Sequence, residues 1–71
     1  MKQVKSANEL AQLVRTELGG DVDLDDIWVS YDHQHGWRVT CIGKPLTVGG
    51  FQYIADRIVE RLREHYDLEA L

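Results

Sequence analysis

Residues 27–42, IWVSYDHQHGWRVTCI, decide the fold, because they contain two alternating strand patterns separated by a polar turn. Successive side chains of a strand point to opposite faces of a sheet. One antiparallel register gathers a wholly apolar face, and it pairs Tyr31 with Trp37, Val29 with Val39, and Ile27 with Cys41. A shift by one residue would scatter these side chains over both faces. The sequence therefore predicts a hairpin in this register, with its turn over residues 32–36.

The second face of this hairpin is mixed in polarity and contains one large aromatic side chain. Its members are Trp28, Ser30, Arg38, Thr40 and Ile42. Trp and Arg are enriched at binding hot spots, and a lone hairpin has two strand edges open to strand addition. We therefore expect a partner protein or a second copy on this face, centred on Trp28. The alternative is that Val22, Leu24 or the N-terminal residues fold over Trp28.

A helical pattern lies on each side of the hairpin. Ser6 and Glu9 have the spacing of a capping box, which predicts a helix over 7–18 that ends at Gly19-Gly20. A longer apolar stripe predicts a second helix over 48–66, with Thr47 as its cap and Leu46 packed on Phe51. Tyr53 lies among the charged residues on the outward side of this helix, where we expect it to be a further contact residue.

These elements predict one α+β domain over residues 1–71, a two-layer sandwich in the order helix, strand, strand, helix. Both helices should cover the apolar face of the hairpin. Residues 21–26, DVDLDD, are interpreted as a loop, with a bulged strand as the alternative. Residues 1–5 either fray or add a short edge strand through Val4, and residues 67–71 are expected to fray. The predicted core is Leu10, Val14, Leu18, Ile27, Val29, Tyr31, Trp37, Val39, Cys41, Phe51, Ile54, Ile58 and Leu62.

Composition restricts the partners. The chain has 71 residues and a formal net charge of −4, from 12 acidic against 8 basic side chains. An acidic chain is a poor candidate for binding nucleic acid or an anionic membrane. It contains a single cysteine, so an intrachain disulfide is impossible, and a reducing cytoplasmic setting fits. A domain of this size buries only about 60% of its unfolded surface, so we expect a small stability margin.

Two short motifs could carry chemistry. His33 and His35 beside Asp32 could begin a metal site, although a solvated turn is the better interpretation. Residues 47–50 open the second helix and could attract an anion, but we favour two glycines that let the helix approach the hairpin closely. We find no catalytic constellation, cofactor site or small-molecule site. The sequence favours a non-enzymatic protein-interaction module, and the alternatives are a nucleic-acid-binding module or a metal-binding domain through His33 and His35.

Overall fold

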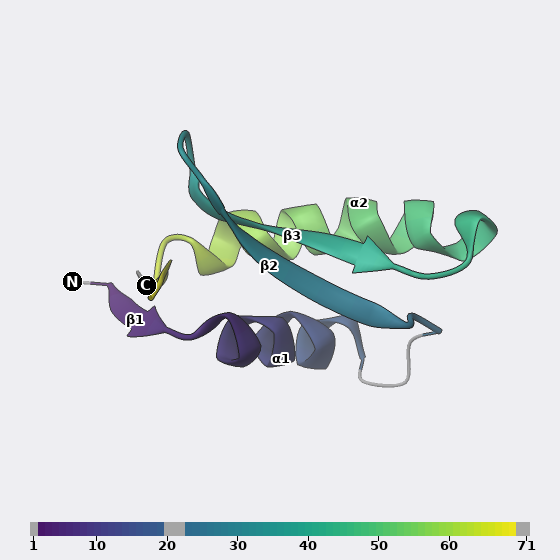
Figure 1. Cartoon of the computed structure of the whole chain (residues 1–71), viewed down its shortest axis with the longest axis horizontal. Coiled ribbons are helices and arrows are strands. Elements are labelled where there is room, and N and C mark those ends of the chain that lie inside the picture. Colours follow the sequence, from purple (N-terminus) through teal and green to yellow (C-terminus); the bar gives the residue numbers. More distant parts are fainter. Residues whose placement is uncertain (1, 20–22, 70–71) are drawn as a thin grey trace.

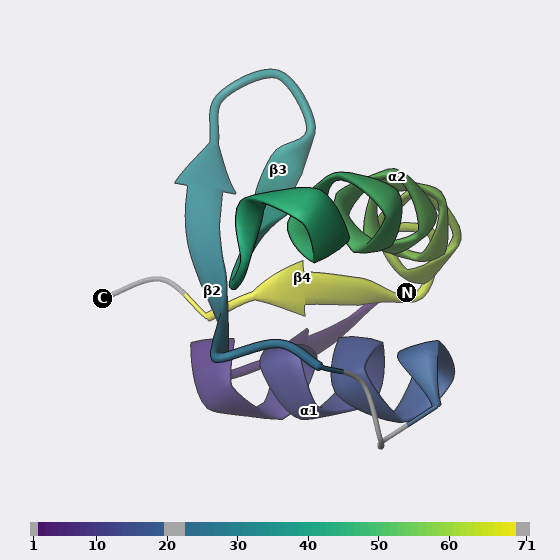
Figure 2. The same ribbon diagram turned by 90° about the vertical axis from the view of Figure 1, so that its right-hand side faces the viewer.

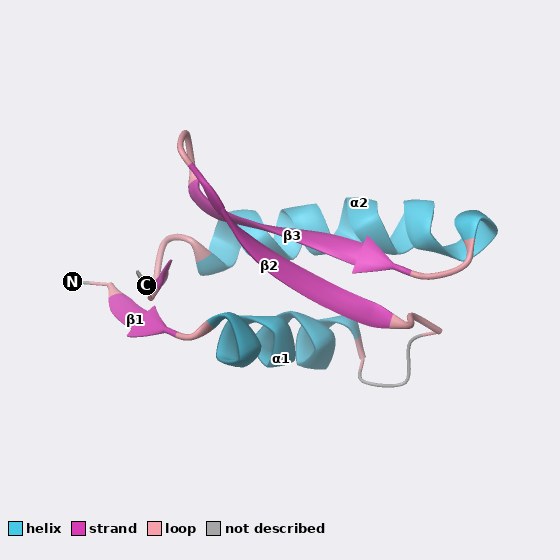
Figure 3. Cartoon of the chain, viewed as in Figure 1, coloured by secondary structure: helices cyan, strands magenta, loops and turns pink. Residues whose placement is uncertain are grey.

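The computed structural model describes residues 2–19 and 23–69 (Figure 1). It is a small α+β fold that contains two helices, one antiparallel strand pair and one parallel strand pair (Figure 3). In chain order the elements are β1 (Gln3–Lys5), α1 (Ala7–Leu18), β2 (Asp26–Asp32), β3 (Gly36–Ile42), α2 (Pro45–Leu62) and β4 (Tyr66–Leu68). Helix α1 packs beside β2, α2 packs beside β3, and the two helices contact each other.

The predicted hairpin register is confirmed. Strands β2 and β3 pair antiparallel, with Val29 opposite Val39 at the centre of the ladder. The turn is closed by Asp32, whose Oδ1 accepts a hydrogen bond of 2.9 Å from the Gln34 amide. Gly36 has a φ of 94°, a conformation that glycine adopts at little steric cost. The turn residues therefore fix the register that the apolar pattern requires.

Helix α1 also matches its prediction. The Ser6 Oγ accepts from the Glu9 amide at 3.2 Å, and the Glu9 side chain accepts from the Ser6 amide at 3.1 Å. These reciprocal bonds satisfy two amide groups that the first helical turn leaves without partners. The helix ends at Gly19, whose φ of 113° is the left-handed C-cap conformation. Gly20, the second glycine of the predicted stop, lies outside the described residues.

Helix α2 differs from its prediction at both ends. It begins at Pro45 with Lys44 as the N-cap, so Thr47 lies inside the helix and does not cap it. Proline suits the first helical position because that amide has no helical partner in any case. Leu46 is fully exposed, so the expected packing of Leu46 on Phe51 is wrong. The helix ends at Leu62, four residues earlier than predicted, and a turn over 63–65 leads into β4.

The core contains residues from both helices, from the hairpin and from the loop before it. Its buried members are Leu10, Val14, Leu24, Ile27, Trp37, Val39, Cys41, Ala55, Val59 and Leu62. Two predicted members are wrong, since Tyr31 is 67% and Ile54 is 48% exposed. Tyr31 lies near the turn end of the hairpin, which projects beyond the helices (Figure 2). Ile54 is displaced because the stripe that faces the core runs through Ala55, Val59 and Leu62 instead.

Of the other predicted core residues, four are only partly buried. These are Leu18, Val29, Phe51 and Ile58, and all four pack against the buried cluster. The second helix therefore contributes its core contacts through smaller side chains than the sequence indicated. Among the buried residues of α2, Ala55 is fully enclosed although its side chain is the shortest.

The two chain ends pair with each other. Strands β1 and β4 are parallel, with Val4 opposite Asp67, and the Glu69 amide donates to the Lys5 carbonyl at 2.8 Å. The indole of Trp37 donates to the Tyr66 carbonyl at 3.0 Å and ties β4 to the hairpin. The predicted fraying is therefore wrong for residues 67–69. Of the two alternatives for the N-terminal residues, the short strand through Val4 is the one that forms. Residues 1 and 70–71 lie outside the description.

The acidic stretch before the hairpin is a loop over 23–25, and Asp26 belongs to β2. The Asp25 amide donates to the Ile42 carbonyl at 2.8 Å, which extends the ladder one residue beyond the strand. Leu24 is buried in the core under the turn at Gly43. Residues 21–22 of the predicted loop are not among those described.

Candidate interaction surface

Trp28 is exposed and held in one orientation. The structure leaves 61% of this residue open, so Leu24 and residues 2–5 do not cover it, and Val22 is outside the described part of the chain. Its indole Nε1 donates to Asp26 Oδ2 at 2.7 Å, and the other carboxylate oxygen accepts from the Ile27 amide at 2.8 Å. Both bonds lower the pKa of Asp26, and the bond from the Trp28 indole has the larger effect. The ionised carboxylate therefore fixes the indole ring on the surface.

The hairpin register places the other predicted contact residues around this ring. Thr40 is directly opposite Trp28, Arg38 is opposite Ser30, and Ile42 is opposite Asp26. Paired residues of an antiparallel ladder share a face. Arg38 is exposed, while Thr40 and Ile42 are half-buried. Within the described residues Arg38 makes no ion pair. We call Trp28, Arg38, Thr40 and Ile42 the hairpin face.

Tyr53 does not belong to the hairpin face. It is 65% exposed on α2, where the Arg57 guanidinium lies 6.0 Å from its ring centroid. The Arg57 Nη1 also donates to the tyrosine hydroxyl at 3.4 Å. The prediction that Tyr53 is exposed is confirmed, but no pocket or hydrogen bond among the described residues joins it to Trp28.

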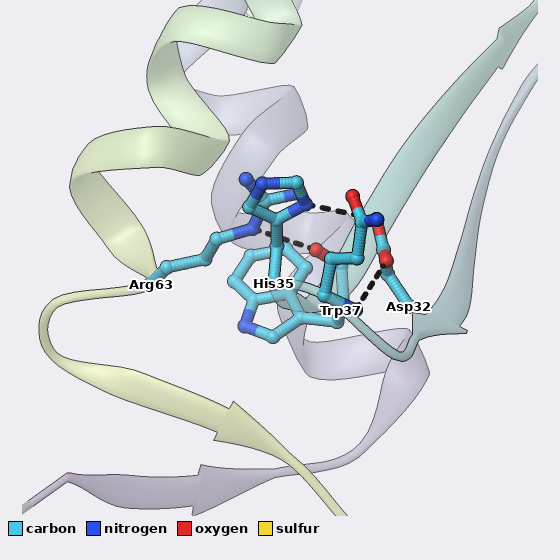
Figure 4. A network of polar contacts seen from close by, with 5 residues as sticks. Asp32, His35, Trp37 and Arg63 are labelled. Atoms are coloured by element: carbon cyan, nitrogen blue, oxygen red, sulfur yellow. Dashed lines mark hydrogen bonds and ion pairs between the residues drawn. The ribbon is translucent and has the colours of Figure 1, made fainter.

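The outer edge of β3 is closed, which the sequence did not indicate. Gln52 on α2 accepts from the Cys41 amide at 2.8 Å through Oε1 and donates to the Val39 carbonyl at 2.9 Å through Nε2. Arg63 Nε donates to the Trp37 carbonyl at 2.7 Å (Figure 4). These side chains occupy the positions that an added strand would need. The expectation of two free hairpin edges is therefore wrong for β3.

The outer edge of β2 is open over its second half. The Cys41 amide and the Val39 carbonyl bind Gln52, so these two residues direct their backbone groups away from β2. In an antiparallel pair of this kind, the residues directly opposite also direct their backbone groups outward. These opposite residues are Ile27 and Val29, whose groups therefore point away from β3. The Ile27 amide is satisfied by Asp26. The backbone groups of Val29 and Tyr31 that face outward have no partner among the described residues. This is the edge that remains available for strand addition.

A groove lies beside this open edge. It has a volume of about 700 Å³ and is lined by Ser6, Ala7, Asn8, Val29, Ser30, Tyr31, Leu68 and Glu69. We call it the β2 groove. A second groove, of about 410 Å³, lies between α1 and β2 and includes Trp28 and Thr40 in its lining. The exposed indole and the open strand edge are therefore both bordered by hollows that could take side chains of a partner.

The sequence did not predict the roles of Gln52, Arg63 and Leu68 in these features. Gln52 and Arg63 resemble solvated helix residues, and nothing in their spacing indicates a bond to a strand edge. Leu68 was expected to fray. Asp26 did carry a signal, because residues two apart on a strand share a face, which places its carboxylate beside Trp28.

The histidine turn does not form a ligand set. The His35 Nδ1 lies 3.3 Å from Asp32 Oδ2 (Figure 4), whereas the His33 ring packs edge-on against Tyr31 at 5.2 Å. Bonds from the Gln34 amide and then from His35 lower the pKa of Asp32. Across residues 2–19 and 23–69, no three His, Cys, Asp or Glu side chains gather closely enough to hold a metal ion.

Gly49 and Gly50 do not serve the role predicted for them. A Cβ atom added to either would meet no neighbouring atom within 4 Å, so neither glycine lets α2 approach the hairpin. Both residues are exposed. The side chain that ties α2 to β3 is instead Gln52, through its bonds to Cys41 and Val39.

No helix in the described part of the chain is both long and apolar enough to cross a membrane. No known protein family, curated protein or solved structure matches this chain.

Proposed function

We propose that this chain is a small non-enzymatic module that binds another protein through the hairpin face and the open edge of β2. In this proposal it is a two-layer sandwich, with both helices on the apolar face of the hairpin and the opposite face left for a partner. The observation that carries the proposal is the exposed Trp28, held by Asp26. A large aromatic side chain already fixed in one orientation loses little conformational entropy when it binds.

The charges around β2 indicate the chemistry of the partner. If two copies paired through β2 with the longest overlap, centred on Val29, Asp26 of each would lie opposite Asp32 of the other. Like charges directly opposite each other destabilise a strand pair, and both carboxyl groups have lowered pKa values. The proposed partner is therefore an extended segment of another protein, with basic residues six positions apart and apolar side chains between them.

The proposal includes a reducing, cytoplasmic setting. In support, the lone Cys41 is free and buried, and a thiol in such a place acts as a small apolar side chain. Nucleic acid is not the proposed ligand. Counterion release needs several unpaired cations on one surface, and the chain carries a net charge of −4.

The test uses a photo-reactive amino acid at Thr40, beside Trp28, in the cells that express the protein. We expect a discrete cross-linked protein that disappears with Trp28→Ala and persists with the control Thr16→Ala on the exposed side of α1. Acrylamide quenching of the purified wild-type protein checks the premise, because Trp37 is fully buried and Trp28 dominates the quenching. A cross-linking pattern that Trp28→Ala leaves unchanged would contradict the proposal.

A further inference from the structure

The β2 groove lies on the α1 side of β2, away from Trp28. Its lining includes Val29 and Tyr31 of the strand, the first turn of α1 (residues 6–8) and the end of β4 (residues 68–69). Val29 and Tyr31 share one face of the strand and Trp28 lies on the other, because successive side chains alternate. The outward backbone groups of the same Val29 and Tyr31 are those left open at the β2 edge. A segment that adds to this edge would therefore direct every second side chain into the groove.

The walls of the groove are apolar. Leu68 and Val29 are half-buried and pack against the core cluster, and Tyr31 is 67% exposed beside them. The hydroxyl of Ser6, a polar group in the lining, is already bonded to the Glu9 amide at 3.2 Å. A partner would gain affinity here by burying apolar surface. The volume of about 700 Å³ leaves room for more than one side chain.

The charge of the groove comes from Glu69, and no Lys or Arg among the described residues lines it. The Glu69 amide donates to the Lys5 carbonyl at 2.8 Å, which fixes the backbone of this residue at the rim of the groove. Its carboxylate is exposed and forms no ion pair within residues 2–19 and 23–69. An apolar wall that ends in a free carboxylate is complementary to Lys or Arg, whose stem is apolar and whose head is charged.

We infer that the β2 groove binds two alternate side chains of the partner segment, one large and apolar and the other Lys or Arg. This inference rests on the proposed function and refines it. The two side chains belong to the residues paired with Val29 and Tyr31, which are about 7 Å apart along the strand. The apolar side chain packs on Leu68, and the basic one ends beside Glu69. The groove thus supplies sequence specificity, while the β2 edge supplies backbone hydrogen bonds that any extended segment can form.

The test uses a phage-displayed library of short random peptides, selected on the purified full chain. For the wild type we expect peptides that share a large apolar residue and a Lys or Arg two positions apart. For Glu69→Lys we expect Asp or Glu in place of that Lys or Arg, and peptides from the wild-type selection should bind this variant at least about tenfold more weakly. Glu60→Lys makes the same change of charge at an exposed position of α2, and it should select the wild-type pattern.

A second pair of variants tests the shape of the groove. Ala7 lines the groove, is exposed and lies outside the core cluster, so Ala7→Phe places a large ring in the groove without changing a core contact. Binding of the selected peptides should fall by about tenfold or more. Thr16→Phe, on the exposed side of α1, is the matched control and should leave binding unchanged.

Peptides that bind Glu69→Lys and Ala7→Phe as tightly as the wild type would overturn this inference. If Trp28→Ala still removed their binding in that case, the proposed function would stand without a pocket for side chains. A wild type that selects no common peptide pattern would also overturn the inference, whereas cross-linking at Thr40 decides the proposed function independently.

Discussion

Asp26 determines how Trp28 is presented. One carboxylate oxygen accepts from the indole and the other accepts from the Ile27 amide, so a single side chain orients the ring and satisfies the first outward amide of β2. Both bonds require an acceptor, which the ionised carboxylate supplies. An exposed tryptophan without such a bond would sample several rotamers and lose more entropy when it binds a partner.

This arrangement makes stability depend on pH in one direction. The pKa of Asp26 in the folded protein lies below its ordinary value of 3.8, so its contribution to stability is complete above that value. The contribution disappears as the pH falls through the folded pKa. For Asp26→Asn we expect lower stability than wild type at pH 6, with the difference shrinking below about pH 4. Urea unfolding at pH 6, 4 and 3 measures this.

Glu69→Gln is the control for this experiment, because Glu69 is an exposed carboxylate in no ion pair between described residues. Its stability difference from wild type should stay nearly constant with pH. A difference between wild type and Asp26→Asn that is equally constant would contradict the role given to the Asp26 carboxylate.

Cys41 is the other residue whose environment predicts a measurable property. Burial first, and the nearby Asp56 second, raise the pKa of its thiol above the ordinary value of 9.0. The thiolate is the reactive form. We expect Cys41 to react with a thiol reagent far more slowly in the native protein than in urea. Equal rates in the two states would show that the core opens around β3.

At the level of elements, the contact between α2 and β3 depends on hydrogen bonds as well as on apolar packing. Gln52 Oε1 and Nε2 bind the Cys41 amide and the Val39 carbonyl. Gln52→Ala would leave both backbone groups without partners at a half-buried edge, which costs about 1–3 kcal/mol for an unsatisfied buried group. Urea unfolding should show a loss of this size, and a smaller loss would mean that water replaces the amide.

Gln12→Ala is the matched control, because Gln12 is exposed on α1 and makes no hydrogen bond with described residues. Its stability should stay within about 0.5 kcal/mol of wild type. Equal effects of the two substitutions would show that the bonds to β3 contribute nothing beyond the loss of a surface glutamine.

At the scale of the whole molecule, the buried side of α2 supplies much of the core. Leu62 is buried and Ile58 is half-buried, so truncating each to alanine tests the observed orientation of the helix. Leu62→Ala should cost about 2–5 kcal/mol, and Ile58→Ala should cost less, because part of its surface already meets water. A domain of this size has little margin. Thermal melting that ranks the two variants in the opposite order would contradict this orientation.

The hairpin and α1 could be predicted because their signals are local. Alternation fixes the register through Val29 and Val39, and the spacing of Ser6 and Glu9 fixes the start of α1. The rest depends on contacts between distant residues. Tyr66 enters a strand because its carbonyl meets Trp37 and because β1 lies beside it, and neither fact is visible in the periodicity of the sequence.

In the candidate surface, too, some features follow from local sequence signals and others depend on contacts between distant residues. The register identified the side chains that share a face with Trp28, while the closed edge of β3 follows from the side-chain length and position of Gln52. The exposure of Tyr31 and Ile54 depends on how far the helices reach along the hairpin and on how α2 is turned. Sequence periodicity does not specify either quantity.

The asymmetry of the two hairpin edges limits how large an assembly can become. A sheet with two open edges can accept a strand on each side, and identical units of that kind can join into a fibre of unlimited length. In this chain Gln52 and Arg63 occupy the β3 edge, so the hairpin can accept a strand only at β2. If a partner strand binds as proposed, each hairpin would therefore accept a single strand, and the expected stoichiometry is one to one. Replacing Gln52 would free the backbone groups of Cys41 and Val39, so that strands could add at both edges of the hairpin and copies could join end to end.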